Sequence, residues 1–97
     1  MSILHTINRS PFQTHALQQC LALMSEQDDL LLIEDAVIAA QAKHTLFKQL
    51  TELAGQGRLM VLTPDLEARG IKNVIGQACS YIGFVELVAK HKSQMAW

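Results

Sequence analysis

The sequence has little of several features that mark common functional classes. Its two cysteines, Cys20 and Cys79, form no CxxC motif, which excludes a thioredoxin-type redox pair and a cysteine-based zinc knuckle. Eight basic and nine acidic residues leave a net charge of −1, so the chain lacks the basic field that holds a nucleic acid by its phosphates. No apolar run approaches the roughly 20 residues that a membrane-spanning helix needs.

The first ten residues, Met1–Ser10, lack the basic region and apolar stretch of a secretory signal peptide. We therefore expect a cytoplasmic protein whose cysteines are free thiols in a reducing compartment. A length of 97 residues suits one domain, and a hydrophobic fraction of 49% excludes an intrinsically disordered chain. We expect a single domain over residues 1–97.

Short apolar segments alternate with segments of helical spacing. The segments expected to be strands are Ile3–Ile7, Leu30–Ile33, Arg58–Thr63 and Ala78–Ile82, and Gly83 is expected to end the last of them. The segments expected to be helical are 11–24, 36–43, 46–54, 64–69 and 84–90. This alternation predicts an α/β domain with a small, mostly parallel sheet and right-handed crossovers.

Capping residues predict where two of these helices begin. Ser10 followed by Pro11 predicts the start of the first helix, because a serine N-cap and a proline at the first helical position are both favourable. Asp35 is expected to cap the alanine-rich second helix.

Cys20 is the first candidate for chemistry, since a thiolate can act as a nucleophile or carry a persulfide. Its predicted place is about two and a half turns into a helix, beside Leu17 and Met24, where the helix dipole helps little. The favoured alternative is that Cys20 packs in the core as a small hydrophobe. The same alternative is favoured for Cys79, which lies in a predicted strand.

The four histidines, His5, His15, His44 and His91, form no HxH, HExxH or cysteine–histidine cluster. No spacing in the sequence therefore indicates a metal or cofactor site. His5, in the first strand, is expected to be packed with its ring nitrogens hydrogen-bonded. His15, in the first helix, is likewise favoured as a structural rather than a catalytic residue.

Polar residues follow the first two predicted strands: Asn8-Arg9-Ser10 and Glu34-Asp35. Ligands of open α/β sheets gather beyond the carboxyl ends of the strands, so a small polar pocket is one interpretation. The favoured one is a helix cap beside a solvated glutamate. Gly55 and Gly57 follow a helix rather than a strand, which is the wrong context for a phosphate-binding loop.

The closing residues Met95-Ala96-Trp97 are apolar but follow a polar, basic stretch. An exposed tryptophan is a typical anchor of a protein interface, so Trp97 and Met95 are candidates for contact with a partner. In the alternative, Trp97 folds back onto its own domain. The sequence leaves both interpretations open.

Four segments occur in order over nearly the whole chain: Leu4–Phe12, Asp29–Ala40, Val61–Gly70 and Lys90–Trp97. Together they resemble the TusB/DsrH family of sulfur-relay proteins, and the last segment resembles the TusB branch closely. The resemblance implies a small three-layer α/β sandwich with a mostly parallel sheet of four or five strands, like that of the DsrE, DsrF and DsrH proteins.

The resemblance also implies partners and a function. Family members form a heterohexamer with TusC/DsrF-like and TusD/DsrE-like subunits, two copies of each. The TusB branch passes persulfide sulfur, received through TusA, to a downstream TusE/DsrC-like carrier and so toward 2-thiolation of a tRNA wobble uridine. The main sulfur-carrying cysteine belongs to the TusD/DsrE subunit. The resemblance therefore implies a mainly structural, non-catalytic subunit that does not bind nucleic acid directly.

A cysteine at position 20 resembles the DsrH branch instead. That branch serves sulfur trafficking in sulfur oxidation. The alternative function is therefore a DsrH-type subunit in which Cys20 is an accessory persulfide carrier.

Overall fold

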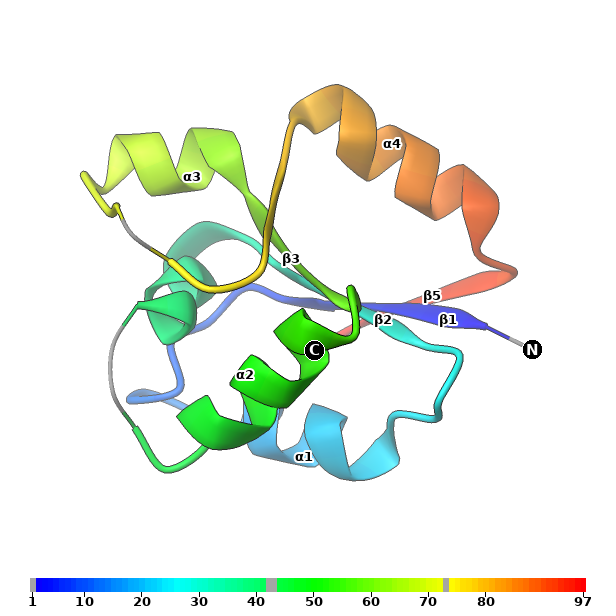
Figure 1. The fold of residues 1–97 in the computed structure, drawn as a ribbon, viewed down its shortest axis with the longest axis horizontal. Coiled ribbons are helices and arrows are strands. Elements are labelled where there is room, and N and C mark those ends of the chain that lie inside the picture. Colours follow the sequence, from blue (N-terminus) through cyan, green and yellow to red (C-terminus); the bar gives the residue numbers. More distant parts are fainter. Residues whose placement is uncertain (1, 42–43, 73) are drawn as a thin grey trace.

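The computed structural model describes residues 2–41, 44–72 and 74–97, which form a parallel sheet covered by helices on both faces (Figure 1). The strands lie in the order β4-β3-β2-β1-β5, and every neighbouring pair is parallel. Their bounds are β1 Ile3–Ile7, β2 Asp29–Leu32, β3 Leu59–Leu62, β4 Gln77–Cys79 and β5 Ser93–Ala96. The predicted α/β fold is confirmed.

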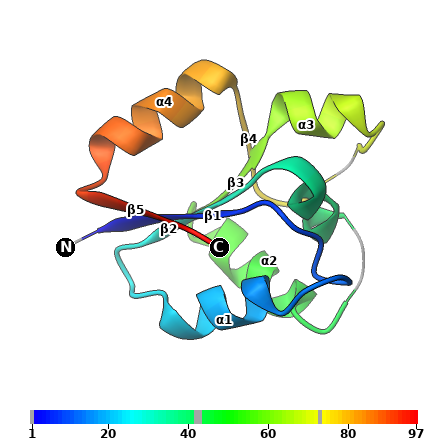
Figure 2. The ribbon, with the colours of Figure 1, turned by 180° about the vertical axis from the view of Figure 1, so that it is seen from behind.

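The helices form the two outer layers. Helices α1 (Ala16–Leu23) and α2 (Phe47–Gly55) cover one face, and α3 (Thr63–Ala68) and α4 (Tyr81–Lys90) lie on the other (Figures 1 and 2). A short 3-10 helix, η1 (Glu34–Ala40), follows β2. Of the helices in the described residues, none is long and apolar enough to cross a membrane.

The last strand was not expected from the sequence, which predicted a tail there. Ser93–Ala96 pairs with β1 in parallel, with Ile3 opposite Ser93 and Thr6 opposite Ala96. All four residues of β5 are exposed, so the segment carries none of the apolar content that marks a buried strand. Backbone pairing with β1, rather than burial of its side chains, defines this strand.

Two predicted helix starts were wrong. The Oγ of Ser10 accepts a hydrogen bond from the Phe12 N–H at 3.1 Å, but this forms only a turn, and α1 begins at Ala16. The alanine-rich segment begins at Glu34 and winds as a 3-10 helix, so Asp35 lies inside it and does not cap it. Residues 42 and 43 of the predicted second helix lie outside the described residues.

The boundary between the fourth strand and the last helix was also predicted too late. Strand β4 ends at Cys79, and Ser80 caps α4 by accepting a hydrogen bond from the Gly83 N–H at 3.0 Å. Gly83 therefore lies within α4 instead of ending a strand. A Cβ at this position would lie 3.2 Å from the Cys79 Sγ, so glycine lets the helix approach the strand closely.

The sheet separates two apolar clusters of unequal size. The larger contains Leu17 and Cys20 of α1, together with Leu30 and Leu32 of β2. The smaller lies under α4 and consists of Leu4, Leu31, Met60 and Cys79, against which Phe84 and Leu87 pack. Alternate residues of β2 therefore serve opposite faces, as the pleat of a strand requires.

Candidate functional site

Cys20 lies on the inner face of α1, in the larger apolar cluster, and is fully buried. Burial raises the pKa of its thiol from 9.0 to about 12, and the nearby negative charge of Asp28 adds to the rise. A thiol in this position stays protonated at neutral pH, whereas nucleophilic attack and persulfide formation need the thiolate.

Cys79 ends β4 and is buried under α4. Burial raises the pKa of its thiol, and the charge of Glu86 acts in the same direction. Its Sγ donates a weak hydrogen bond to the Ser80 carbonyl at 3.4 Å. Both thiols are therefore packed and protonated in the folded chain.

A buried polar cluster lies between the start of β2, the middle of β1 and the end of β5. Asp28 accepts hydrogen bonds from three sides: from the Ile3 N–H at 3.0 Å, the Ser25 N–H at 3.1 Å and the His5 Nε2–H at 2.9 Å. The other ring nitrogen of His5, Nδ1, accepts a hydrogen bond from the Trp97 indole N–H at 3.1 Å. The prediction that His5 is packed with both ring nitrogens hydrogen-bonded is confirmed.

The partners of His5 determine its protonation state. An indole N–H can only donate a hydrogen bond, so Nδ1 of His5 carries a lone pair. The proton therefore resides on Nε2 and points at the Asp28 carboxylate. His5 is the neutral Nε2–H tautomer, and the cluster holds one negative charge, on Asp28.

The donors around Asp28 stabilise that charge. Burial alone would raise the pKa of this carboxyl, but the hydrogen bonds from His5, Ser25 and Ile3 outweigh it and lower the pKa from 3.8 to about 2. Arg58 holds the same segment from outside, because its guanidinium donates to the backbone carbonyls of Asp28, at 2.9 Å, and Ser25.

Trp97 is part of this cluster. Its side chain packs against the larger apolar cluster, and its backbone N–H donates to the Thr6 carbonyl at 3.0 Å. Trp97 thus folds back onto its own domain, which is the second of the two interpretations of the sequence. Met95 remains partly exposed, so contact of either residue with a partner stays a prediction.

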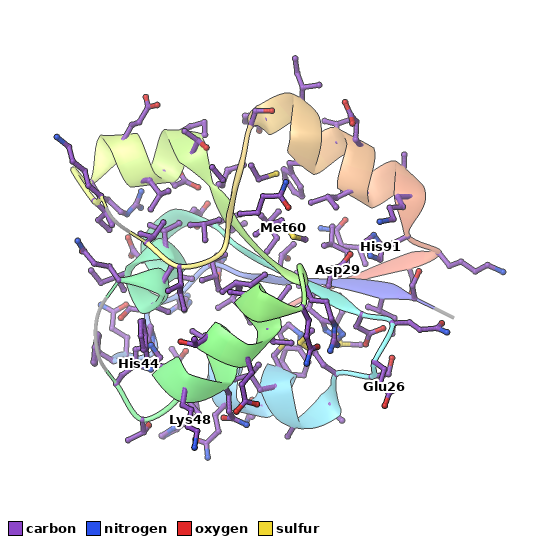
Figure 3. All side chains as sticks on the ribbon, in the orientation of Figure 1. Glu26, Asp29, His44, Lys48, Met60 and His91 are labelled. Carbon is purple, nitrogen blue, oxygen red and sulfur yellow. The ribbon has the colours of Figure 1, made fainter. Side chains whose placement is uncertain are left out.

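A second histidine–aspartate pair lies on the α4 side of the sheet, where Figure 3 shows His91 and Asp29 side by side. The His91 Nε2 lies 2.9 Å from Asp29 Oδ2, and its Nδ1 donates to the Leu87 carbonyl at 2.8 Å. Both partners are acceptors, so the pair holds a proton between Nε2 and Oδ2 in addition to the one on Nδ1. The geometry therefore fits a ring with a proton on each nitrogen.

The carboxyl edge of the sheet brings together residues that follow the first three strands. Ser10 and Asp35 line the same shallow surface depression with Arg69. Arg69 donates two hydrogen bonds to Asp35 Oδ1, at 2.9 and 3.2 Å, and lies 3.7 Å from Asp65 Oδ1. The carboxylates are therefore neutralised by an arginine of the chain itself, which favours a structural over a ligand-binding interpretation.

Glu34, in the turn after β2, has an unusual backbone conformation. Its φ of 50° lies in the left-handed region, where the backbone of a residue other than glycine is strained. Its backbone N–H donates to Asp65 Oδ2 at 2.7 Å, which holds the turn between β2 and η1 against α3. The expected cap residue Asp35 thus pairs with Arg69, and Asp65 carries the backbone contact.

The two remaining histidines are apart from these clusters. His15 is exposed just before α1. His44 donates from Nε2 to the Ala39 carbonyl at 3.0 Å and accepts from the Leu46 N–H at Nδ1, and its ring packs edge-on against Phe12 and Phe47. In the described part of the chain, no three His, Cys, Asp or Glu side chains gather in a group that could hold a metal ion.

The outer face of α4 exposes several large apolar side chains. Tyr81, Ile82, Val85 and Val88 are all exposed, Ile82 to 74%, and none of the ten residues of α4, all of them described, is buried. Only Phe84 and Leu87 pack toward the sheet. The helix thus presents an apolar stripe that the described part of the chain leaves uncovered.

The sequence interpretation missed Asp28, Asp29 and the role of His91. The signal was the pair of aspartates directly before a fully apolar strand, because a carboxylate at the entrance of a buried strand needs a donor. Which histidine each carboxylate contacts depends on β5, and that strand has no pattern of its own.

The chain is similar to known proteins over nearly its full length. A family described as DsrH-like protein matches residues 9–94. Protein TusB of Cronobacter sakazakii is 41% identical over 98% of this chain and all of its own length. The TusB proteins of Escherichia coli O81 and Buchnera aphidicola, at 39% and 33% identity, are covered to the same extent. The chain therefore belongs to the TusB/DsrH family.

Proposed function

We propose that this chain is a mainly structural subunit of a sulfur-relay complex that passes persulfide sulfur toward 2-thiolation of the tRNA wobble uridine. The carrying observation is that both of its thiols are buried and protonated in a chain that aligns with TusB proteins over 98% of its length. Such a chain contributes surface and shape to the relay, while the transferred sulfur travels on cysteines of other subunits.

The proposed partners are TusC/DsrF-like and TusD/DsrE-like subunits in a cytoplasmic heterohexamer, with a TusE/DsrC-like carrier downstream. The apolar stripe of α4 supports an assembly, since a stripe of this kind is costly to leave in water. The net charge of −1 supports a role without direct tRNA contact. Trp97 and Met95 lie at the opposite edge of the sheet from β4 and are further candidates for contact.

In the DsrH-type alternative, Cys20 carries sulfur. This would require α1 to open and the thiol to ionise beside the negative charge of Asp28. Among the described residues, no contact of Cys20 lowers either cost, so we propose that Cys20 packs the core.

The test is co-expression with the two sister subunits, sulfur loading with a cysteine desulfurase and its substrate cysteine, and intact-mass analysis of every chain. We expect this chain to co-purify without added sulfur mass while a partner gains it. Cys20→Ser should leave relay activity unchanged, with Cys79→Ser as the matched control. One sulfur on this chain that disappears in Cys20→Ser would contradict the proposal and identify a second carrier. A chain that remains monomeric beside its sisters would contradict the assembly itself.

A further inference from the structure

The segment 91–97, here called the β5 segment, is fastened to the rest of the domain at both ends by a histidine–aspartate pair. At its start, His91 contacts Asp29, and at its end Trp97 contacts His5, which contacts Asp28. The two aspartates are consecutive, and their side chains lie on opposite faces of the sheet. Between these points all four residues of β5 are exposed, so few apolar contacts hold the strand.

The fastening at Trp97 requires that His5 lacks a proton on Nδ1. When solvent supplies that proton, Nδ1 becomes a donor that faces the indole N–H at 3.1 Å. Two donors cannot share a hydrogen bond, so the Trp97 contact breaks while the His5–Asp28 contact survives. This end of the β5 segment is therefore sensitive to acid.

The fastening at His91 requires the opposite. Its two ring nitrogens face two acceptors, the Leu87 carbonyl and the Asp29 carboxylate, so both contacts are made only while each nitrogen carries a proton. When one proton leaves to solvent, the other stays with the carboxylate, which is the stronger acceptor, so a ring lone pair faces the Leu87 carbonyl at 2.8 Å and that contact is lost. This end of the β5 segment is therefore sensitive to alkali.

The charged and titratable groups around each pair are part of this balance. His5 faces Asp28, and the same carboxyl group lies close to Cys20 of α1 and under the backbone contacts of Arg58. His91 faces Asp29 of β2. Lys90 of α4 and Cys79 of β4 line the cavity in which Asp29 lies, and Lys92 follows His91 in the chain.

We infer that the β5 segment is a two-ended pH latch, in which acid releases Trp97 through His5 and alkali releases the end of α4 through His91. Both ends of the strand are held only at pH values between the loss of the Trp97 contact in acid and the loss of the His91 contact in alkali. Because each end has its own histidine, each end opens independently of the other.

Amide hydrogen exchange of the β5 segment tests the latch in the dilute full-length chain. Exchange is followed by mass spectrometry at steps from about pH 5 to about pH 10, and rates are divided by the intrinsic rate at each pH to give protection factors. We expect protection to be highest at intermediate pH and to fall by about tenfold on each side, the loss that one hydrogen bond produces. A profile without such falls would overturn the proposal.

Single variants show which histidine causes each fall in amide protection. In His5→Gln the acid fall should disappear, because the amide accepts from Trp97 and donates to Asp28 without titrating. In His91→Gln the alkaline fall should disappear for the corresponding reason. His15→Gln, at an exposed position, is the matched control and should keep both falls. An acid fall that persists in His5→Gln, or an alkaline fall that persists in His91→Gln, would overturn the corresponding end of the latch.

A second pair of variants serves if a glutamine variant does not fold. Trp97→Phe removes the indole donor, so protonation of His5 breaks no contact with residue 97 and the acid fall should be lost. Asp29→Asn offers His91 an amide that can accept or donate, so the alkaline fall should be lost. If either variant retained the full fall of the wild-type chain, the latch would be refuted at that end.

Discussion

The two histidine–aspartate pairs are built from the same side chains at the same distance, yet they hold different charges. Each joins a histidine Nε2 to an aspartate Oδ2 at 2.9 Å, and each histidine side chain is only 2% exposed. The third partner differs: His5 also accepts from an indole N–H, whereas His91 also donates to a backbone carbonyl. The group behind the ring, and not the carboxylate in front of it, decides whether the histidine is neutral or charged.

The carboxylates differ in a corresponding way. Asp28, 3% exposed, is held by backbone donors as well as by its histidine, while Asp29, 16% exposed, faces a histidine that can bring a positive charge. The buried carboxylate of Asp28 is therefore supported by several neutral donors, whereas the partly buried carboxylate of Asp29 faces a histidine ring. Substitution of each aspartate separates these two ways of holding a charge.

The largest effect is expected for Asp28→Ala. This change leaves the N–H groups of Ile3, Ser25 and His5 without their acceptor in a buried site. Removing one partner of a buried polar pair costs about 3 kcal/mol, a large part of the stability of a domain of this size. Urea unfolding measures the loss. Asp35→Ala, at an exposed surface pair, is the control and should cost less than about 1 kcal/mol.

The pH dependence of stability is expected to show the lowered pKa of Asp28. Because the folded pKa of about 2 lies below the ordinary value of 3.8, this carboxylate adds stability above about pH 4 that is lost as the pH falls toward 2. The contribution is roughly 2 kcal/mol. Urea midpoints between about pH 5 and about pH 2 should fall less in Asp28→Asn than in the wild-type chain. Equal slopes in the two proteins would contradict the lowered pKa.

A smaller effect is expected for Asp29→Asn, because the amide of asparagine still offers His91 a hydrogen bond and only the charge is lost. We expect a loss of about 1 kcal/mol at neutral pH, measured by urea unfolding. A loss as large as that of Asp28→Ala would show that the charge of Asp29 matters more than the donors that surround Asp28.

The smallest effect is expected for Cys20→Ala, which removes a buried sulfur but no hydrogen bond that Asp28 uses. A loss of no more than about 1 kcal/mol is expected from the small cavity. In the wild-type chain, a maleimide should label Cys20 only after unfolding. Rapid labelling of the native chain at neutral pH would contradict the burial of the thiol.

The apolar framework of the fold could be predicted from the sequence, and the polar contacts could not. The apolar segments Leu30–Ile33 and Arg58–Thr63 identify β2 and β3 because burial acts locally, and the segment 64–69 was expected to be helical, as most of it is in α3. The start of α1 was misplaced because Ser10 forms a turn instead, and the ring of Phe12 in that turn contacts the distant ring of His44. Local signals cannot report a contact of that kind.

The candidate site shows the same limit. The packed state of His5 was predictable from its position in an apolar strand. Its bond to Trp97, 92 residues away, depends on β5, which is polar, short and recognisable only beside β1. The protonation states of both histidines follow from such distant partners, so no spacing in the sequence contains them.

The pairing of β1 with β5 has a consequence for the synthesis of the chain. Strand β1 leaves the ribosome before the other strands of the sheet, but one of its two neighbours in the sheet is formed by residues 93–96. Until those residues emerge, the backbone groups along that side of β1 have no partner, and an open strand edge invites pairing with other chains. The nascent domain is thus exposed to aggregation until residues 93–96 have emerged. A folding helper or a sister subunit that covers β1 during this interval would protect it.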